Sequence, residues 1–326
     1  MKKIKLLPIA FESFGVRSMC TFVETPDLKI LLDPGISLGP RFALLPHPLE
    51  YEARKKCRDR LREFAKKAEI ITISHYHNDH YTPNYVENVW IGSSPEEAEN
   101  VYKDKIVLMK DIKSSINFNQ RRRGWMIQKL IKRIAKNSMS ADGKDLEFGK
   151  TKIKFSRPVF HGIENSQLGW VLMLTIYADD EKLLYASDVQ GPMVKDTLEL
   201  ILDDDPCVLI IGGPPFYLLD FRVKSEDVGV AIENLKKIVK KIPTTILEHH
   251  SLRSENWREF IHPVFEVAKK SNNEVLTGAE FIGEANSLLE FKRRELYKTN
   301  PPSEDFLKWT KLPSEARRKT PPPIDL

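Results

Sequence analysis

Short apolar runs separated by charged stretches define most of the expected elements of this chain. In the first quarter the pattern predicts strands at residues 4–14, 20–24, 29–33 and 69–74. The third of these stops at Asp33-Pro34-Gly35, a turn signal. Residues 46–67 carry charges along one side and predict a helix, and Ser94-Pro95 marks the start of another.

The rest of the chain alternates between the same two patterns. Further strands are predicted at residues 152–160, 170–177, 182–186, 207–211 and 244–248. Helices are predicted at 225–241 and 255–270. Strands that alternate with helices favour a layered α/β architecture. We predict one domain over residues 1–298, followed by a proline-rich tail at 299–326 that is extended or wraps around the domain.

Residues 110–137 are strongly basic and contain Arg121-Arg122-Arg123. Met126, Leu130 and Ile134 recur there at helical spacing, which predicts a basic helical insertion. The segment is interpreted either as a solvated helix face or as an arm that attracts phosphate groups. Its single tryptophan is thin support for stacking on a base.

Composition adds only broad limits. The net charge of +5 permits an acidic partner without requiring one, and abundant Lys and Glu are typical of heat-adapted proteins. Cys20, Cys57 and Cys207 have no paired spacing and are expected to be buried thiols in a reducing compartment. No apolar stretch is long enough to span a membrane, and the first residues lack the pattern of a signal peptide. We therefore expect a cytoplasmic protein without a membrane segment.

The most informative segment is Ser74-His75-Tyr76-His77-Asn78-Asp79-His80, which directly follows an apolar run. Imidazole is a common ligand of borderline metals, and a carboxylate adds charge and an oxygen donor. His75 and His77 are two residues apart on an extended backbone, so they point to the same side and can bind one ion together. Asp79 and His80 lie past the strand end and can reach a second ion.

Other metal-ligand types also follow apolar runs. His161 follows Val159-Phe160, Asp188 follows residues 183–187, and His249-His250 follows residues 245–248. Strand ends are where a rigid scaffold can bring ligands together.

The order His-x-His-x-Asp-His, then a single His, a single Asp and a last His resembles the metallo-β-lactamase superfamily. The resemblance extends over about residues 28–253, and the whole chain is similar to an archaeal family of predicted metal-dependent hydrolases. It implies a four-layer αβ/βα sandwich with the site along one sheet edge. It also implies two divalent metal ions and hydrolysis by a metal-bridging hydroxide.

The resemblance implies a role for each residue of the pattern. His75, His77 and His161 would bind the first ion, and Asp79, His80 and His249 the second, with Asp188 bridging both. Asp33 would orient ligands from behind. Adjacent side chains are expected to diverge, so only one residue of the pair His249-His250 should be a ligand; we favour His249, with His250 as the alternative.

A nitrogen-rich ligand set favours Zn²⁺, with Mn²⁺ or Fe²⁺ as alternatives. Asp79 is the expected catalytic residue, because it can orient or deprotonate the attacking water. The basic segment and the positive metal pair favour a phosphoester or phosphodiester, either a small molecule or a nucleic acid. The short gap between Asp188 and His249 leaves no room for the inserted domain of the superfamily's long-chain RNA nucleases.

Two other functions stay open at this point. One is hydrolysis of a lactone or small ester. The other is nucleic-acid binding by a protein whose metals are structural.

Two further regions can be explained without a catalytic or metal-binding role. His47 lies between two prolines and is expected to be a solvated loop residue. Gly212-Gly213-Pro214-Pro215 predicts a strand-ending turn, after which Phe216 and Tyr217 either line the pocket or pack as aromatics.

Overall fold

Two β-sheets form the centre of the molecule in a computed structural model that describes residues 1–324. The first sheet has six strands in sequence order, antiparallel from β1 to β3 and parallel from β3 to β6. Its strands are β1 (Lys5–Phe11), β2 (Met19–Glu24), β3 (Lys29–Leu32), β4 (Ile70–Ile73), β5 (Ile106–Met109) and β6 (Asn137–Ser140).

The second sheet has seven strands in the order β15-β14-β13-β12-β11-β8-β7, and its β12 to β15 are parallel. Its strands are β7 (Asp145–Phe148), β8 (Thr151–Phe155), β11 (Leu174–Ala178), β12 (Glu181–Tyr185), β13 (Val208–Gly212), β14 (Thr244–Glu248) and β15 (Glu274–Leu276). A small ribbon of β9 (Val159–Phe160) and β10 (Trp170–Val171) lies beside it.

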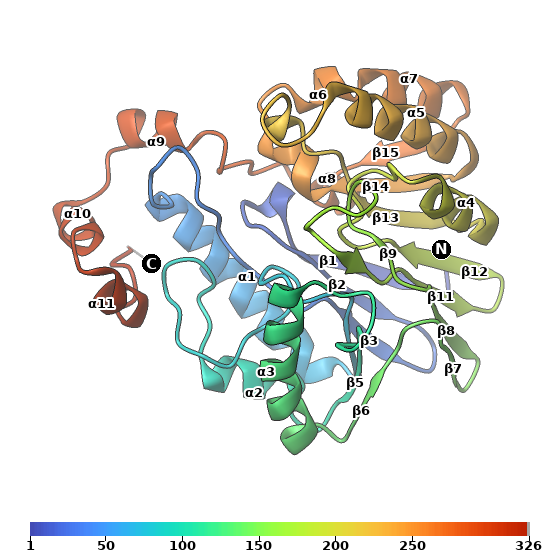
Figure 1. Ribbon diagram of the computed structural model, residues 1–326, viewed down its shortest axis with the longest axis horizontal. Coiled ribbons are helices and arrows are strands. Elements are labelled where there is room, and N and C mark those ends of the chain that lie inside the picture. Colours follow the sequence, from blue (N-terminus) through green and yellow to red (C-terminus); the bar gives the residue numbers. More distant parts are fainter. Residues whose placement is uncertain (325–326) are drawn as a thin grey trace.

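Helices cover the outer face of each sheet (Figure 1). The first sheet is covered by α1 (Pro48–Lys67), α2 (Pro95–Tyr102) and α3 (Phe118–Ile134). The second is covered by α4 (Lys195–Asp204), α5 (Ser225–Lys241), α6 (Trp257–Phe260) and α7 (His262–Lys270).

A third apolar core, which includes Leu32, Ile176 and Ile210, joins the inner faces of the two sheets. Helix, sheet, sheet and helix therefore form four layers, and the predicted αβ/βα sandwich is confirmed. No helix within residues 1–324 has the length and apolar character needed to cross a bilayer.

The basic segment is a regular crossover of the first sheet. Its helix α3 connects β5 to the parallel strand β6 and buries Ile127, Leu130 and Ile131 against the sheet. A parallel pair requires such a crossover, so this helix is part of the sheet's own topology. Its charged residues lie on the outward side, together with the half-exposed Trp125.

The position of His47 between two prolines predicted a solvated loop residue. This prediction is wrong, because the side chain is 1% exposed. Its Nδ1 accepts a hydrogen bond from the backbone N–H of Leu49, and the Glu50 carboxylate accepts one from the His47 N–H. Its Nε2 also contacts the carbonyl oxygen of Asn300 at 2.8 Å. The imidazole is buried because it caps α1 and joins that helix to the C-terminal segment.

The C-terminal segment wraps along α1 as short helices (Figure 1). They are α9 (Arg293–Thr299), α10 (Glu304–Thr310) and α11 (Ser314–Lys319), preceded by α8 (Gly278–Phe281). Phe306 and Trp309 are buried, with ring centres 5.9 and 5.7 Å from that of Tyr51 in α1. Residues from this segment therefore extend the core of the first half.

Replacing Arg293 by alanine is expected to lower the free energy of unfolding by about 3–5 kcal/mol, because it leaves the Glu50 charge buried and unpaired. Arg293 is 0% exposed, and its guanidinium donates to both carboxylate oxygens of Glu50 at 2.7 and 2.8 Å. Chemical denaturation would measure the change. The exposed Lys298→Ala in the same helix is the control, and an equal effect of both variants would contradict this role for the pair.

Candidate metal centre

The loop after β4 brings His75 and His77 together. Strand β4 is buried on both faces, so its end is fixed within the sheet, and the loop starts at Ser74. The Nε2 of His75 lies 3.0 Å from the Nδ1 of His77. Two ring nitrogens at this distance can share one ion.

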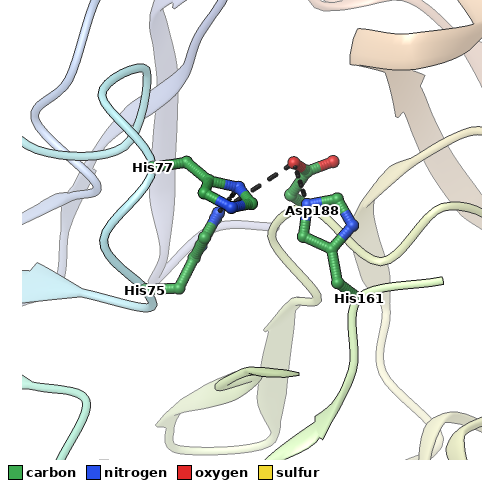
Figure 2. A group of neighbouring side chains, drawn as sticks. All are labelled: His75, His77, His161 and Asp188. Atoms are coloured by element: carbon green, nitrogen blue, oxygen red, sulfur yellow. Dashed lines mark hydrogen bonds and ion pairs between the residues drawn. The ribbon is translucent and has the colours of Figure 1, made fainter. Parts of the chain in front are cut away.

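Two segments of the second half complete this group (Figure 2). His161 follows β9 and Asp188 follows β12, and the His161 Nε2 lies 2.6 Å from the Asp188 Oδ2. The Nε2 of His75 is 4.0 Å from the same oxygen. One donor atom from each of the four side chains lies within 4.8 Å of the others.

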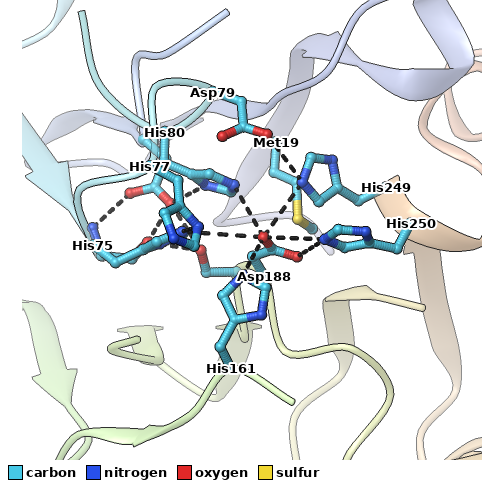
Figure 3. A network of polar contacts seen from close by, with 12 residues as sticks. Met19, His75, His77, Asp79, His80, His161, Asp188, His249 and His250 are labelled. Atoms are coloured by element: carbon cyan, nitrogen blue, oxygen red, sulfur yellow. Dashed lines mark hydrogen bonds and ion pairs between the residues drawn. The ribbon is translucent and has the colours of Figure 1, made fainter. Parts of the chain in front are cut away.

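Asp79, His80 and His249 form a second group whose donor atoms also lie within 4.8 Å of one another. The His249 Nε2 is 3.5 Å from the Asp79 Oδ2 and 3.5 Å from the Asp188 Oδ2. The His80 Nε2 is 3.6 Å from that same Asp188 oxygen. Asp188 thus lies between the two groups (Figure 3).

His250 also points into the cluster, with its Nε2 3.1 Å from the Asp188 Oδ1. The expectation that the adjacent histidine side chains diverge is wrong. His249 adopts a left-handed backbone conformation with φ of 65° at the end of β14, so both rings turn toward Asp188. Such strain in a non-glycine residue is typical of functional sites.

Asp33 fixes the cluster from behind. Its fully buried carboxylate accepts hydrogen bonds from the Ser74 N–H at 2.7 Å, the Ser187 hydroxyl at 2.8 Å and the Tyr185 hydroxyl at 3.0 Å. It also contacts the His80 Nδ1 at 2.9 Å. That contact sets the orientation of the ring, so that the His80 Nε2 faces Asp188.

Glu12 and Arg253 hold His249 in position, and neither residue was predicted from the sequence. The Glu12 Oε2 lies 2.9 Å from the His249 Nδ1, and the other Glu12 oxygen accepts from the Arg253 guanidinium. All three side chains are buried. The available signal was a carboxylate directly after the apolar strand β1, too common a pattern to identify a site.

Tyr217 and Gln120 were also missed as contacts of the histidines. The Tyr217 hydroxyl lies 3.0 Å from the His250 Nδ1, and the Gln120 Nε2 lies 3.4 Å from the His77 Nε2. Phe216 instead stacks on Phe260, with ring centres 4.6 Å apart. Of the two aromatics after the Gly-Gly-Pro-Pro turn, only Tyr217 therefore touches the cluster.

Burial and the neighbouring carboxylates act in opposite directions on the pKa values of the histidines in the cluster. Burial lowers the pKa of His77 and of His250 to about 3, so both rings are neutral and offer a lone pair. Burial alone would lower the pKa of His80 as well, but its contacts with Asp188 and Asp33 raise it to about 9. Burial opposes ionisation of Asp79 and Asp188, yet the surrounding imidazoles hold the pKa of each well below its usual range.

Several donor atoms lack the hydrogen bonds that buried polar groups normally make. Within residues 1–324, the Nε2 atoms of His80 and His161 and the Oδ1 of Asp188 have no partner in hydrogen-bond geometry, although ring nitrogens and carboxylate oxygens of the cluster lie as close as 2.6 and 3.1 Å. Buried polar atoms are rarely left unpaired, and these three point toward the shared centre. Imidazole nitrogens with carboxylate oxygens are the donor set of zinc and similar ions, so the side chains fit two such ions.

Relatives with the same overall chain exist in several archaea. The UPF0282 protein of Methanopyrus kandleri is 41% identical over 294 residues, covering 90% of this chain and 99% of the relative. The chain belongs to the UPF0282 family. A second UPF0282 protein, from Thermococcus sibiricus, is 40% identical over 297 residues, with 90% and 94% covered. The expected archaeal relationship is confirmed, although no family model matches the chain.

Solved structures similar to this UPF0282 protein share its layered fold at low sequence identity. CmlA, a diiron β-hydroxylase from Streptomyces venezuelae, matches with a TM-score of 0.50 and 12% identity over 84% of this chain and 52% of that one. The metallo-β-lactamase fold protein YhfI from Bacillus subtilis matches with a TM-score of 0.49 and 14% identity over 87% and 98%. The fold expected from the resemblance is confirmed.

Proposed function

We propose that this UPF0282 protein is a metal-dependent hydrolase with a dinuclear centre, most suited to zinc. The observation that carries the proposal is the convergence of separate strand ends on Asp188, with unpaired donor atoms aimed at a common space. Two bound divalent ions would supply Lewis acidity and bring the pKa of a shared water toward neutrality. His75, His77 and His161 would hold one ion and Asp79, His80 and His249 the other, with Asp188 between them and His250 as a further or alternative donor.

Asp79 is the residue best placed to handle a proton. Its side chain is 17% exposed, more than that of Asp188, and it lines a cavity together with His77. The neighbouring positive groups keep it ionised, so it can accept a hydrogen bond from an attacking water and orient it. Asp33 and Glu12 do not line this cavity and act by holding His80 and His249 in position.

The fold alone does not select this chemistry, since a diiron hydroxylase has a similar fold. The donor set supports hydrolysis, because histidine stands at position 77, where a glutamate would suit a di-iron site.

The alternative of structural metals in a nucleic-acid-binding protein is less well supported. Structural zinc sites are closed by four protein ligands, whereas His77 and Asp79 border a cavity of about 570 Å³ here.

A substrate panel tests the proposal. Metal-loaded protein would be assayed with bis-p-nitrophenyl phosphate, a single-stranded oligonucleotide and a homoserine lactone. We expect the phosphodiesters to be hydrolysed, while turnover of the lactone alone would favour the small-ester alternative. Failure to hydrolyse any of the three, with metal bound, would contradict the proposed function.

Glu12→Gln is expected to weaken binding of one metal equivalent about 10–100-fold, because the residue orients His249. The glutamine keeps the shape of the side chain but loses the charge that pairs with Arg253. Competition with a chromophoric zinc chelator would measure the affinity. Glu284→Gln, an exposed change, is the control, and unaltered zinc affinity in Glu12→Gln would refute the orienting role.

A further inference from the structure

The open cavity of about 570 Å³ that borders His77 and Asp79 is lined by segments from distant parts of the sequence. Loops at residues 37–40 and 85–91 form part of the wall, and α3 and α11 supply one arginine each, Arg123 and Arg318. Its volume lies within the range of small-molecule sites in enzymes. The basic helix and the C-terminal segment therefore meet beside the metal centre.

Some charged side chains that line this cavity have a partner of opposite charge, and others have none among the described residues. Arg17 is held by Glu290 through contacts of 2.6 and 2.8 Å, and the Glu87 carboxylate accepts backbone N–H groups of Val89, Trp90 and Ile91. Arg123 and Arg318, in contrast, form no ion pair with a carboxylate anywhere in residues 1–324. Two uncompensated guanidinium groups beside a metal centre favour an anionic ligand, above all a phosphate.

The position of Arg318 is fixed although its helix is short. The backbone and side-chain N–H groups of Asn88 donate to the Arg318 carbonyl oxygen at 2.9 and 3.1 Å. Trp309, in the preceding helix, is buried, and its indole N–H donates to the Thr320 carbonyl oxygen at 3.0 Å. These bonds fix the backbone of Arg318 at the C-terminal end of α11, from which its exposed side chain borders the cavity.

Aromatic side chains provide the other part of the wall. Tyr85 is 36% exposed and Trp90 is partly buried, and both line the cavity. The bonds from the backbone to Glu87 fix the loop that carries Trp90. Aromatic surface next to arginines is the combination that binds the base and the phosphate of a nucleotide.

A second cavity, of about 210 Å³, lies next to the first, with residues of α3 in its lining. Both are lined by Tyr85 and Arg123, and the second adds Asn119 and Arg122. The two cavities therefore adjoin each other at Tyr85 and Arg123, and the second extends the basic lining to the exposed Arg122 of α3.

We propose, on the basis of the hydrolase function above, that these cavities bind a nucleotide phosphoester, with Arg123 and Arg318 holding phosphate and Tyr85 and Trp90 contacting a base. The ester then lies beside His77 and Asp79. In hydrolysis the oxygen of water bonds to phosphorus, the ester P–O bond breaks and the leaving oxygen takes a proton from that water. The second cavity accommodates a neighbouring nucleotide, so a single strand binds more tightly than a mononucleotide.

Fluorescence anisotropy with a 5′-fluorescein-labelled oligothymidylate of six residues tests the site by binding rather than turnover. We expect the double variant Arg123→Ala/Arg318→Ala to bind about 10–100-fold more weakly than the wild type. The slope of log affinity against log salt should fall by about 1.4, the value for two lost contacts to a single strand. Lys132→Ala/Lys311→Ala is the matched control, since it removes two exposed charges from the same two segments outside both cavities.

Thymidine 5′-monophosphate as competitor separates the two sources of the nucleotide. We expect the strand to displace the probe at lower concentrations than the mononucleotide does, which identifies a chain as the ligand. Displacement by both at similar concentrations identifies a free nucleotide and refutes the role of the second cavity. Equal loss of binding in both double variants, or no binding of either probe, overturns the site. If the protein hydrolyses bis-p-nitrophenyl phosphate but binds no nucleotide, only this inference is refuted. If binding is lost in Arg123→Ala/Arg318→Ala alone and no phosphoester is hydrolysed, the binding site is supported and the phosphoester hydrolase is refuted.

Discussion

Asp79→Ala is expected to lower kcat on a phosphodiester by about 10²–10⁴-fold, the range for loss of a group that handles the proton of the attacking water. The Asp79 carboxylate is more exposed than that of Asp188, and it lies 3.5 Å from the His249 Nε2 and 3.9 Å from the Arg253 guanidinium. Its loss removes the proposed donor to the second ion and the acceptor that lines the cavity. The free energy of unfolding should change by no more than about 1 kcal/mol, because no apolar core is opened.

Steady-state kinetics with bis-p-nitrophenyl phosphate, together with a denaturation curve, would check both parts of this expectation. Asp59→Ala is the matched control, since Asp59 is an exposed aspartate of α1 that pairs with Lys55. A variant at position 79 that retained more than about a tenth of wild-type kcat would disprove the assigned role.

Asp188→Ala is expected to reduce the bound metal from about two equivalents to one or fewer, because this carboxylate is shared by both groups of ligands. Its two oxygens lie within 4.0 Å of ring nitrogens from His75, His80, His161, His249 and His250. Without it, neither group retains its central anionic donor.

Elemental analysis of the dialysed variant would give the metal content, and circular dichroism would show whether it is folded. Asp196→Ala, at the exposed start of α4, is the control for the loss of one aspartate. A folded Asp188→Ala protein that still binds two equivalents would mean that the ions, if bound, are not bridged by this residue.

The strands and the ligand motif were accessible from the sequence because both depend on local pattern. Apolar runs marked β4, β12 and β14, and the ligand types directly after them had to lie at strand ends. The carboxyl ends of β12 and β14 lie at one edge of the second sheet, because both strands run parallel to β13. The residues after β4 come from the first sheet and join them because the two sheets pack face to face.

The residues that position the ligands could not be predicted in this way. Glu12 and His249 are 237 positions apart, and Glu12 and Arg253 are 241 apart. Contacts between residues so far apart in the sequence cannot be predicted from a local pattern. The backbone of His249 has a positive φ without glycine, so the direction of the His250 ring was hidden as well.

Two other regions were predicted only in part. Proline and charge in the C-terminal segment left open whether it is extended or wraps around the domain. It wraps along α1 through Phe306 and Trp309, which are too few to give a helical period in the sequence. The helix of the basic segment was visible from its spacing, whereas its role as a crossover depends on pairing between β5 and β6.

The metal content of the wild-type chain tests the central claim most directly. Protein purified without an immobilised-metal step, loaded with zinc and dialysed, would be measured by inductively coupled plasma mass spectrometry against protein concentration. A binuclear centre predicts about two equivalents of zinc per chain. Less than about half an equivalent of any divalent metal in folded protein would contradict it.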